Sequence, residues 1–175
     1  MRWEALFDDL EARFAALRAE ELPAVVAELT RAERATVTLV GRVRASLGRE
    51  LRVRVRSGET VLGELLDAGA EWLLLGEGPR RVLVPVHAVV HVRGLADLVE
   101  PEGAPPRRLG LGHALRALAR DRVPVRLLAH GTVLRGRIEL VGADHLELVE
   151  LGEELRGPGE RWTVPVAALD LVASA

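Results

Sequence analysis

The sequence predicts a mainly β protein with N-terminal α-helices, in which two small antiparallel barrels follow one another along the chain. Three observations lead to this fold class: helical periodicity at the N-terminus, alternation of apolar and polar residues after residue 35, and an internal repeat. The chain has 175 residues, of which 49% are hydrophobic, so it can bury the core of one domain or of two small ones.

Residues 1–34 have the spacing of amphipathic helices. Apolar residues alternate spacings of four and three from Trp3 to Leu17, the pattern of a helix that buries one stripe. Pro23 suits the first turn of a second helix, which we expect to end near Arg34. The segment can dock on the rest of the protein or pair with a second copy. We favour docking, because fewer than three heptads is little for a free-standing coiled coil.

Residues 35–98 form the first predicted barrel. The runs TVTLVGRVR and ELRVRVR alternate around Leu47 and Gly48, which predicts a hairpin. Alternate residues on paired strands would then share one face, which would carry Arg42, Arg44, Arg52, Arg54 and Arg56. Such a row can contact a phosphate backbone bidentately, or it can be a solvated face that pairs with neighbouring acids.

Residues 99–112 are rich in proline, glycine and charge and form the predicted linker, and residues 113–175 form the second barrel with a short helix at its start. Two barrels are predicted because one set of three glycines recurs at a constant offset, Gly58, Gly63 and Gly69 matching Gly131, Gly136 and Gly142. We expect these glycines at a turn, at a bend within a strand and at a strand end, in that order. A small barrel built on this unit would remove most exposed strand edges.

Two stretches of the repeat carry a resemblance to a known family. The second copy reads LRALARDRVPVRLLAHGTVLRG from Leu115 to Gly136, and the first copy ends in VHAVVHV followed by Arg93 and Gly94. Both stretches resemble the Sm-like superfamily, and in particular its bacterial Hfq-like RNA chaperones. The resemblance implies a tandem of Sm-like barrels, which are small SH3-like antiparallel barrels that commonly form oligomers.

The resemblance also implies a non-enzymatic regulator that binds RNA or single-stranded nucleic acid. Under this hypothesis the helix arginines Arg116, Arg120 and Arg122 contact phosphates, and His87 and Arg93 match the end of the family pattern. The turns that hold the uridine-contacting residues of the family read AGAEWL and VGADHL in this chain. Their acids, Glu71 and Asp144, would repel phosphate, so a uridine pocket of the family type is not expected.

Composition argues against several other classes of function. The chain has no cysteine, so it has neither a disulfide framework nor a thiolate zinc site, and His87 and His91 lack a third ligand nearby in sequence. No nucleophile is paired with a base, so we expect no enzyme, no cofactor and no metal. The longest uncharged run is shorter than the roughly 20 residues of a membrane span, and the N-terminus lacks the apolar segment of a secretory signal, which predicts a cytoplasmic protein without a membrane partner.

Charge is unevenly distributed along the chain. The net charge is −2, yet residues 36–60 and 101–128 each hold six arginines and two acids. These basic islands favour nucleic-acid binding. The alternative is a protein-interaction or self-assembly module, which would use barrel edges or the N-terminal helices to bind itself or a protein partner.

Overall fold

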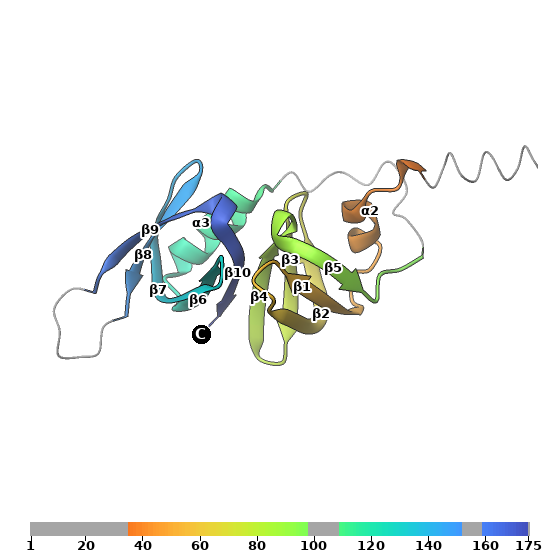
Figure 1. Ribbon diagram of the computed structural model, residues 1–175, viewed down its shortest axis with the longest axis horizontal. Coiled ribbons are helices and arrows are strands. Elements are labelled where there is room, and N and C mark those ends of the chain that lie inside the picture. Colours follow the sequence, from red (N-terminus) through yellow and green to blue (C-terminus); the bar gives the residue numbers. More distant parts are fainter. Residues whose placement is uncertain (1–34, 98–108, 152–158, 175) are drawn as a thin grey trace, which may run out of the picture. The chain divides into compact units, whose positions relative to one another are not determined.

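The computed structural model describes residues 35–97, 109–151 and 159–174, which are mostly β. Ten strands form one antiparallel sheet in the order β5-β1-β2-β3-β4-β10-β6-β7-β8-β9 (Figure 1). The strands are β1 (Glu50–Val55), β2 (Thr60–Ala68), β3 (Trp72–Glu77), β4 (Arg80–Pro85), β5 (Val89–Arg93), β6 (Val125–Ala129), β7 (Thr132–Val141), β8 (His145–Glu150), β9 (Arg161–Pro165) and β10 (Leu169–Ser174). The described helices are α2 (Leu39–Arg44), α3 (Leu111–Asp121) and the short 3-10 helices η1 (Val86–Ala88) and η2 (Val166–Ala168).

The prediction of two closed tandem barrels of the Sm-like type is wrong. The sheet does not close on itself, because β5 and β9 end it and each pairs with one neighbouring strand in the described chain. It also runs without a break from one repeat to the next, since β4 pairs with β10. Alternation in a sequence shows which face of a strand is buried, but it does not show which strand edges meet, so the pattern could not reveal this pairing.

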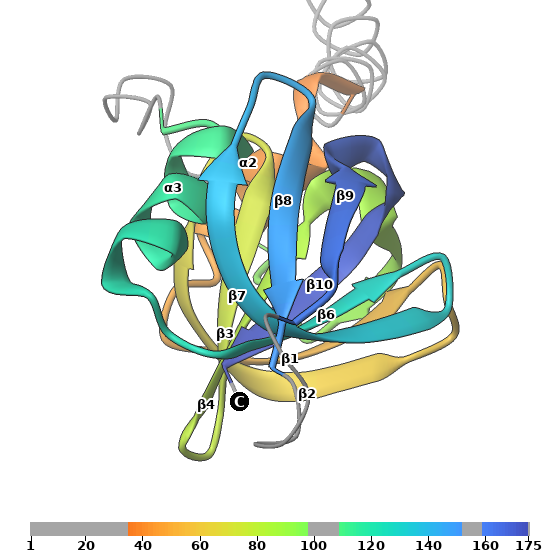
Figure 2. The ribbon, with the colours of Figure 1, turned by 90° about the vertical axis from the view of Figure 1, so that its left-hand side faces the viewer.

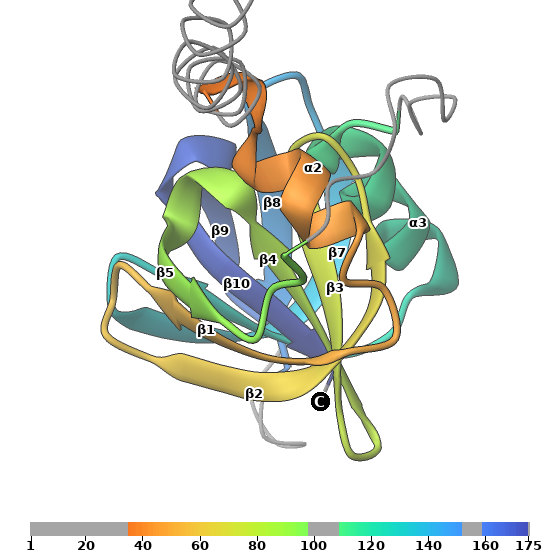
Figure 3. The ribbon, with the colours of Figure 1, turned by 90° about the vertical axis from the view of Figure 1, so that its right-hand side faces the viewer.

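The internal repeat is nevertheless present in the order of the strands. The first half, residues 39–97, has the order β5-β1-β2-β3-β4, and the second half, residues 109–174, has the equivalent order β10-β6-β7-β8-β9. In each half the last strand therefore lies beside the first. Figures 2 and 3 show the strands of the two halves from opposite ends.

The two strands at the junction of the halves are buried on both faces. Alternate side chains of β4 belong to different cores, Val82 and Val84 to the core of the first half and Leu83 to that of the second. In β10 Leu171 likewise packs in the first core, and Val172 packs in the second. This arrangement explains the nearly continuous apolar runs in both strands, because a strand covered on both faces has no polar side.

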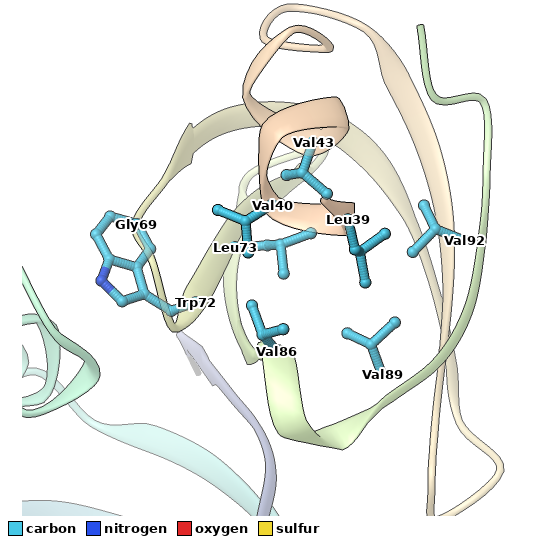
Figure 4. A pocket seen from close by; sticks show the side chains of 9 residues that line it. All are labelled: Leu39, Val40, Val43, Gly69, Trp72, Leu73, Val86, Val89 and Val92. Carbon is cyan, nitrogen blue, oxygen red and sulfur yellow. The ribbon is translucent and has the colours of Figure 1, made fainter. Parts of the chain in front are cut away.

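Residues 39–44 were predicted to be a strand of a hairpin but form the helix α2. Val40 and Val43, three residues apart, line an apolar pocket together with Leu73 and Val86 (Figure 4). The space between these side chains is too narrow for a water molecule, so the pocket is a packing contact. The spacing of the valines fits one helical turn as well as a strand, and so short a run cannot distinguish the two.

Other predicted boundaries differ or lie outside the described residues. The longest uncharged run, from Val82 to Val92, is divided at Pro85 into β4, η1 and β5. The N-terminal helices predicted for residues 1–34 and most of the predicted linker, 99–112, lie outside the described residues, although α3 begins within that linker at Leu111. The chain from Leu39 onward clusters as one compact unit, and its division into domains 35–98 and 113–175 remains a prediction.

The second glycine of each repeat lies where two strands approach closely. A Cβ atom on Gly63 would be 2.4 Å from the carbonyl oxygen of Gly76, and one on Gly136 would be 2.2 Å from that of Val149. The predicted irregularity in these strands follows the glycines, as register shifts after Leu65 and Ile138. Both positions require glycine because any side chain would collide with backbone of the neighbouring strand.

We therefore expect Gly136→Ala to lower the free energy of unfolding by about 1–3 kcal/mol, the range for overpacked sites. Gly112→Ala is the matched control, since a Cβ there meets only the end of the Arg116 side chain at 3.5 Å. It lies in α3, where alanine is preferred, and should stabilise the protein by about 0.5 kcal/mol. Urea unfolding of both variants tests the expectation, and equal stability of the two would contradict it.

Candidate functional site

Four basic residues project from one outer face of the first half. Because Leu51, Val53 and Val55 of β1 are buried, the residues between them point outward. β5 lies beside β1 (Figure 3) and adds two more exposed positions to the same face. We call this set the β1–β5 face, which consists of Arg52, Arg54, His91 and Arg93.

The charges of the β1–β5 face have no acidic partner in the described part of the chain. The register places Arg52 opposite Arg93 and Arg54 opposite His91. Arg54 donates a hydrogen bond from Nη1 to the neutral Thr60 Oγ1 at 3.1 Å. The exposed acids on the same side of the sheet are Glu50 of β1 and Glu64, which lies opposite it on β2. Like charges directly opposite in a sheet are destabilising, so the fold accepts a cost at this face.

The corresponding face of the second half is mostly apolar. At the equivalent register positions, the second half has Arg126, Leu128, Leu171 and Ala173 in place of Arg52, Arg54, His91 and Arg93, respectively. Leu128, Leu171 and Ala173 are 3%, 0% and 5% exposed and pack in the core of the first half. Arg126 forms an ion pair with Glu59 of the first half. The same face is thus covered in one half, and open and basic in the other.

The structure does not bring together the five arginines predicted to share one face. Arg42 donates from Nε and Nη2 to the carbonyl oxygen of Ala96 at 3.2 and 3.0 Å, which ties α2 to the segment after β5. Arg44 lies in the same helix. Arg56 is bonded to the buried Asp170 at the junction of the halves. Arg52 and Arg54 remain on the exposed face.

A second basic cluster lies where α3 ends beside β7 (Figure 2). Arg120, Arg122 and Arg137 line a hollow of about 540 Å³, here called the α3–β7 hollow, together with Ala119, Ile138 and Glu139. Arg116, the third helix arginine predicted as a site residue, does not line it. Sequence reasoning missed Arg137, although the alternation of β7, in which Gly136 and Ile138 are buried, places it on the exposed side.

Three other residues discussed from the sequence have defined partners. Nε2 of His87 lies 3.2 Å from the carbonyl oxygen of Leu169, at the junction of the halves. Glu71 accepts a hydrogen bond from the backbone N–H of Leu111 at 2.8 Å and so caps the start of α3. The His145 ring lies 2.9 Å from Asp144, and its hydrogen bond and charge hold the pKa of that carboxyl below its usual value.

Compared with models of known protein families and with curated proteins, the chain matches none. The assignment of a function therefore depends on the two basic clusters.

Other kinds of site are less well supported by the geometry. In the described ranges, no three histidine or acidic side chains are grouped so that they could hold a metal ion. A helix able to cross a membrane is also not found in those ranges.

Proposed function

We propose that the protein binds RNA or another single-stranded nucleic acid without catalysing a reaction, and that the β1–β5 face contacts the phosphate backbone. The observation that carries the proposal is that the two halves hold different kinds of residue at equivalent positions. Where the second half has Leu128, Leu171 and Ala173 against a core, the first half has Arg54, His91 and Arg93 in solvent. An anion bound on the face would offset the repulsion between its basic side chains.

The shape and chemistry of the face suit a phosphate polymer. Arginine binds phosphate through two parallel hydrogen bonds, and Arg52 and Arg54 stand about 7 Å apart along β1, as alternate residues of a strand do. An exposed sheet face without a pocket suits an extended chain, whereas small molecules usually bind in a concave site. Only 3% of the residues are aromatic, so little base stacking is available and we expect weak sequence preference.

Replacement of Arg52, Arg54 and Arg93 by glutamine is expected to lower the affinity for single-stranded RNA about 10-fold to 100-fold at low salt. The slope of log affinity against log salt concentration should fall by about 2, because about three phosphate contacts are lost. Fluorescence anisotropy of a labelled oligonucleotide, repeated across a salt series, measures both quantities.

The matched control removes the same charge from another part of the sheet. Arg80, Arg81 and Arg135 are also exposed and lie on β4 and β7, outside the β1–β5 face. Their replacement by glutamine should weaken binding much less. Equal losses in the two triple variants would show that net charge, and not this face, determines the affinity.

We propose a protein-interaction or self-assembly module as the alternative function, because both ends of the sheet are open. β5 and β9 each pair with a single strand in the described chain, and Val90 and Trp162 at these edges are 60% and 41% exposed. An open edge is a template for pairing with another chain. Light scattering of the nucleic-acid-free protein over a dilution series separates the two proposals. An apparent molecular mass that rises with protein concentration supports only the self-assembly module.

A further inference from the structure

We infer that the α3–β7 hollow binds a phosphate monoester group, such as that of a mononucleotide or of the 5′ end of a nucleic acid. This inference does not rest on the proposed function of the β1–β5 face. Arg120, Arg122 and Arg137 come from two elements and line one concave space of about 540 Å³. A concave site suits a compact ligand, in contrast to the exposed sheet face described above.

The charges around the hollow favour an anion. Glu139 is the single acid that lines it, and its Oε2 lies 3.1 Å from Nη2 of Arg161. Arg161 lies outside the hollow and also pairs with Glu147 at 2.9 Å, so it shares its charge between two carboxylates. Within the hollow three arginines face the one carboxylate of Glu139. A phosphate monoester carries a charge of about −1.5 to −2 at neutral pH and three acceptor oxygens, which three guanidiniums can bind through paired hydrogen bonds.

The backbone of Arg122 is an independent indication that its side chain is needed. Arg122 ends α3 in the left-handed conformation, with φ 51° and ψ 28°, and its N–H donates to the carbonyl oxygen of Ala119. Glycine usually holds such a position, because other residues lose stability there. Within the described residues no side-chain hydrogen bond or ion pair explains an arginine. Residues kept in strained conformations cluster at ligand sites.

Attraction of cations to the end of a helix does not account for the whole arrangement. The carboxyl end of a helix carries a partial negative charge, which favours arginine near it and would explain Arg120 and the cap residue Arg122, but not Arg137. Asp121, in the same turn, has the opposite charge and does not line the hollow. Arg137 belongs to β7 and receives no benefit from the helix. A ligand that contacts all three arginines accounts for their convergence.

The test compares Arg122→Gly and Arg137→Gln with the unchanged full-length chain. The probes are adenosine 5′-monophosphate against adenosine, and a single-stranded RNA with a 5′-phosphate against the same strand with a 5′-hydroxyl. We expect the unchanged protein to prefer a phosphorylated probe about tenfold. Both variants should lose this preference. Arg122→Gly should at the same time raise the midpoint of thermal unfolding, since glycine relieves the left-handed position.

A purely structural role for Arg122 would change stability and leave the preference intact. Equal binding of phosphorylated and unphosphorylated probes by the unchanged protein, or a preference that survives in Arg122→Gly, would overturn the inference. Preference for the mononucleotide supports a small-molecule phosphate as the ligand, and preference for the strand alone supports a nucleic-acid end. The triple glutamine variant of the β1–β5 face should keep the preference, so failure here and failure of the proposed function are distinguishable.

Discussion

Arg56→Leu is expected to lower the free energy of unfolding by about 3–5 kcal/mol, whereas Asp170→Val should lower it far less. Asp170 is fully buried in β10, and its Oδ1 accepts a hydrogen bond from Nε of Arg56 at 3.2 Å. Without Arg56 an unpaired carboxylate stays in the interior. Without Asp170 the arginine, whose side chain is 34% exposed, is still partly solvated and still donates from Nη2 to the carbonyl oxygens of Ala167 and Leu169 at 3.0 and 3.3 Å.

The repeat supplies the substitutions for this experiment. Val90 of β5 occupies the position of Asp170 in the first half, so valine is the residue that the repeat itself carries at this position. The double variant Arg56→Leu, Asp170→Val should be more stable than Arg56→Leu alone, because it contains no buried charge. Urea unfolding of the two single variants and the double variant completes the cycle. Equal losses in both single variants would show that the ion pair is not the source of the effect.

This ion pair is one of several contacts that make the two halves one structure. β4 pairs with β10, Arg126 of the second half pairs with Glu59 of the first, and each core receives side chains from both halves. The effect of Arg56→Leu should therefore extend beyond β1. We expect the described strands to unfold in one transition, because neither core is complete within its own half.

Much of the local structure could be predicted from the sequence, whereas the pairing of the halves could not. The alternation ELRVRV predicted β1 and the outward direction of Arg52 and Arg54, because burial of one face repeats every two residues. The continuous apolar runs of β4 and β10 indicate burial on both faces, but they do not show that these two strands pair with each other, because the pairing is made by backbone groups. The prediction of closed barrels failed for that reason.

The candidate sites were predictable to a similar degree. Arg120 and Arg122 were identified through the helix, but their neighbour Arg137 lies on a strand and becomes close only through the packing of α3 on β7. Arg56 was assigned to the exposed row because its partner Asp170 is 114 residues away. His91 and Arg93 join the exposed face through the register of β5, which alternation alone does not determine.

The triple variant Arg54→Leu, His91→Leu, Arg93→Ala is expected to make the protein associate. The introduced side chains are those of Leu128, Leu171 and Ala173, which occupy the equivalent positions of the second half and are buried against the first half. On the first half they would create an exposed apolar patch beside the unpaired edge of β5 and the exposed Val90. Arrays of repeats need a polar outer face on the terminal unit to stay soluble, and the arginines supply it.

Sedimentation over a dilution series measures this association, with the control variant Arg54→Gln, His91→Gln, Arg93→Gln. The control removes the same charges without adding apolar surface, so it should lose affinity for RNA and keep the sedimentation coefficient of the unchanged protein. If the apolar variant also keeps that coefficient at every concentration, the basic residues do not prevent association. Phosphate binding would then be the remaining reason for a like-charge pair such as Arg52 and Arg93, since the fold itself gains nothing from it.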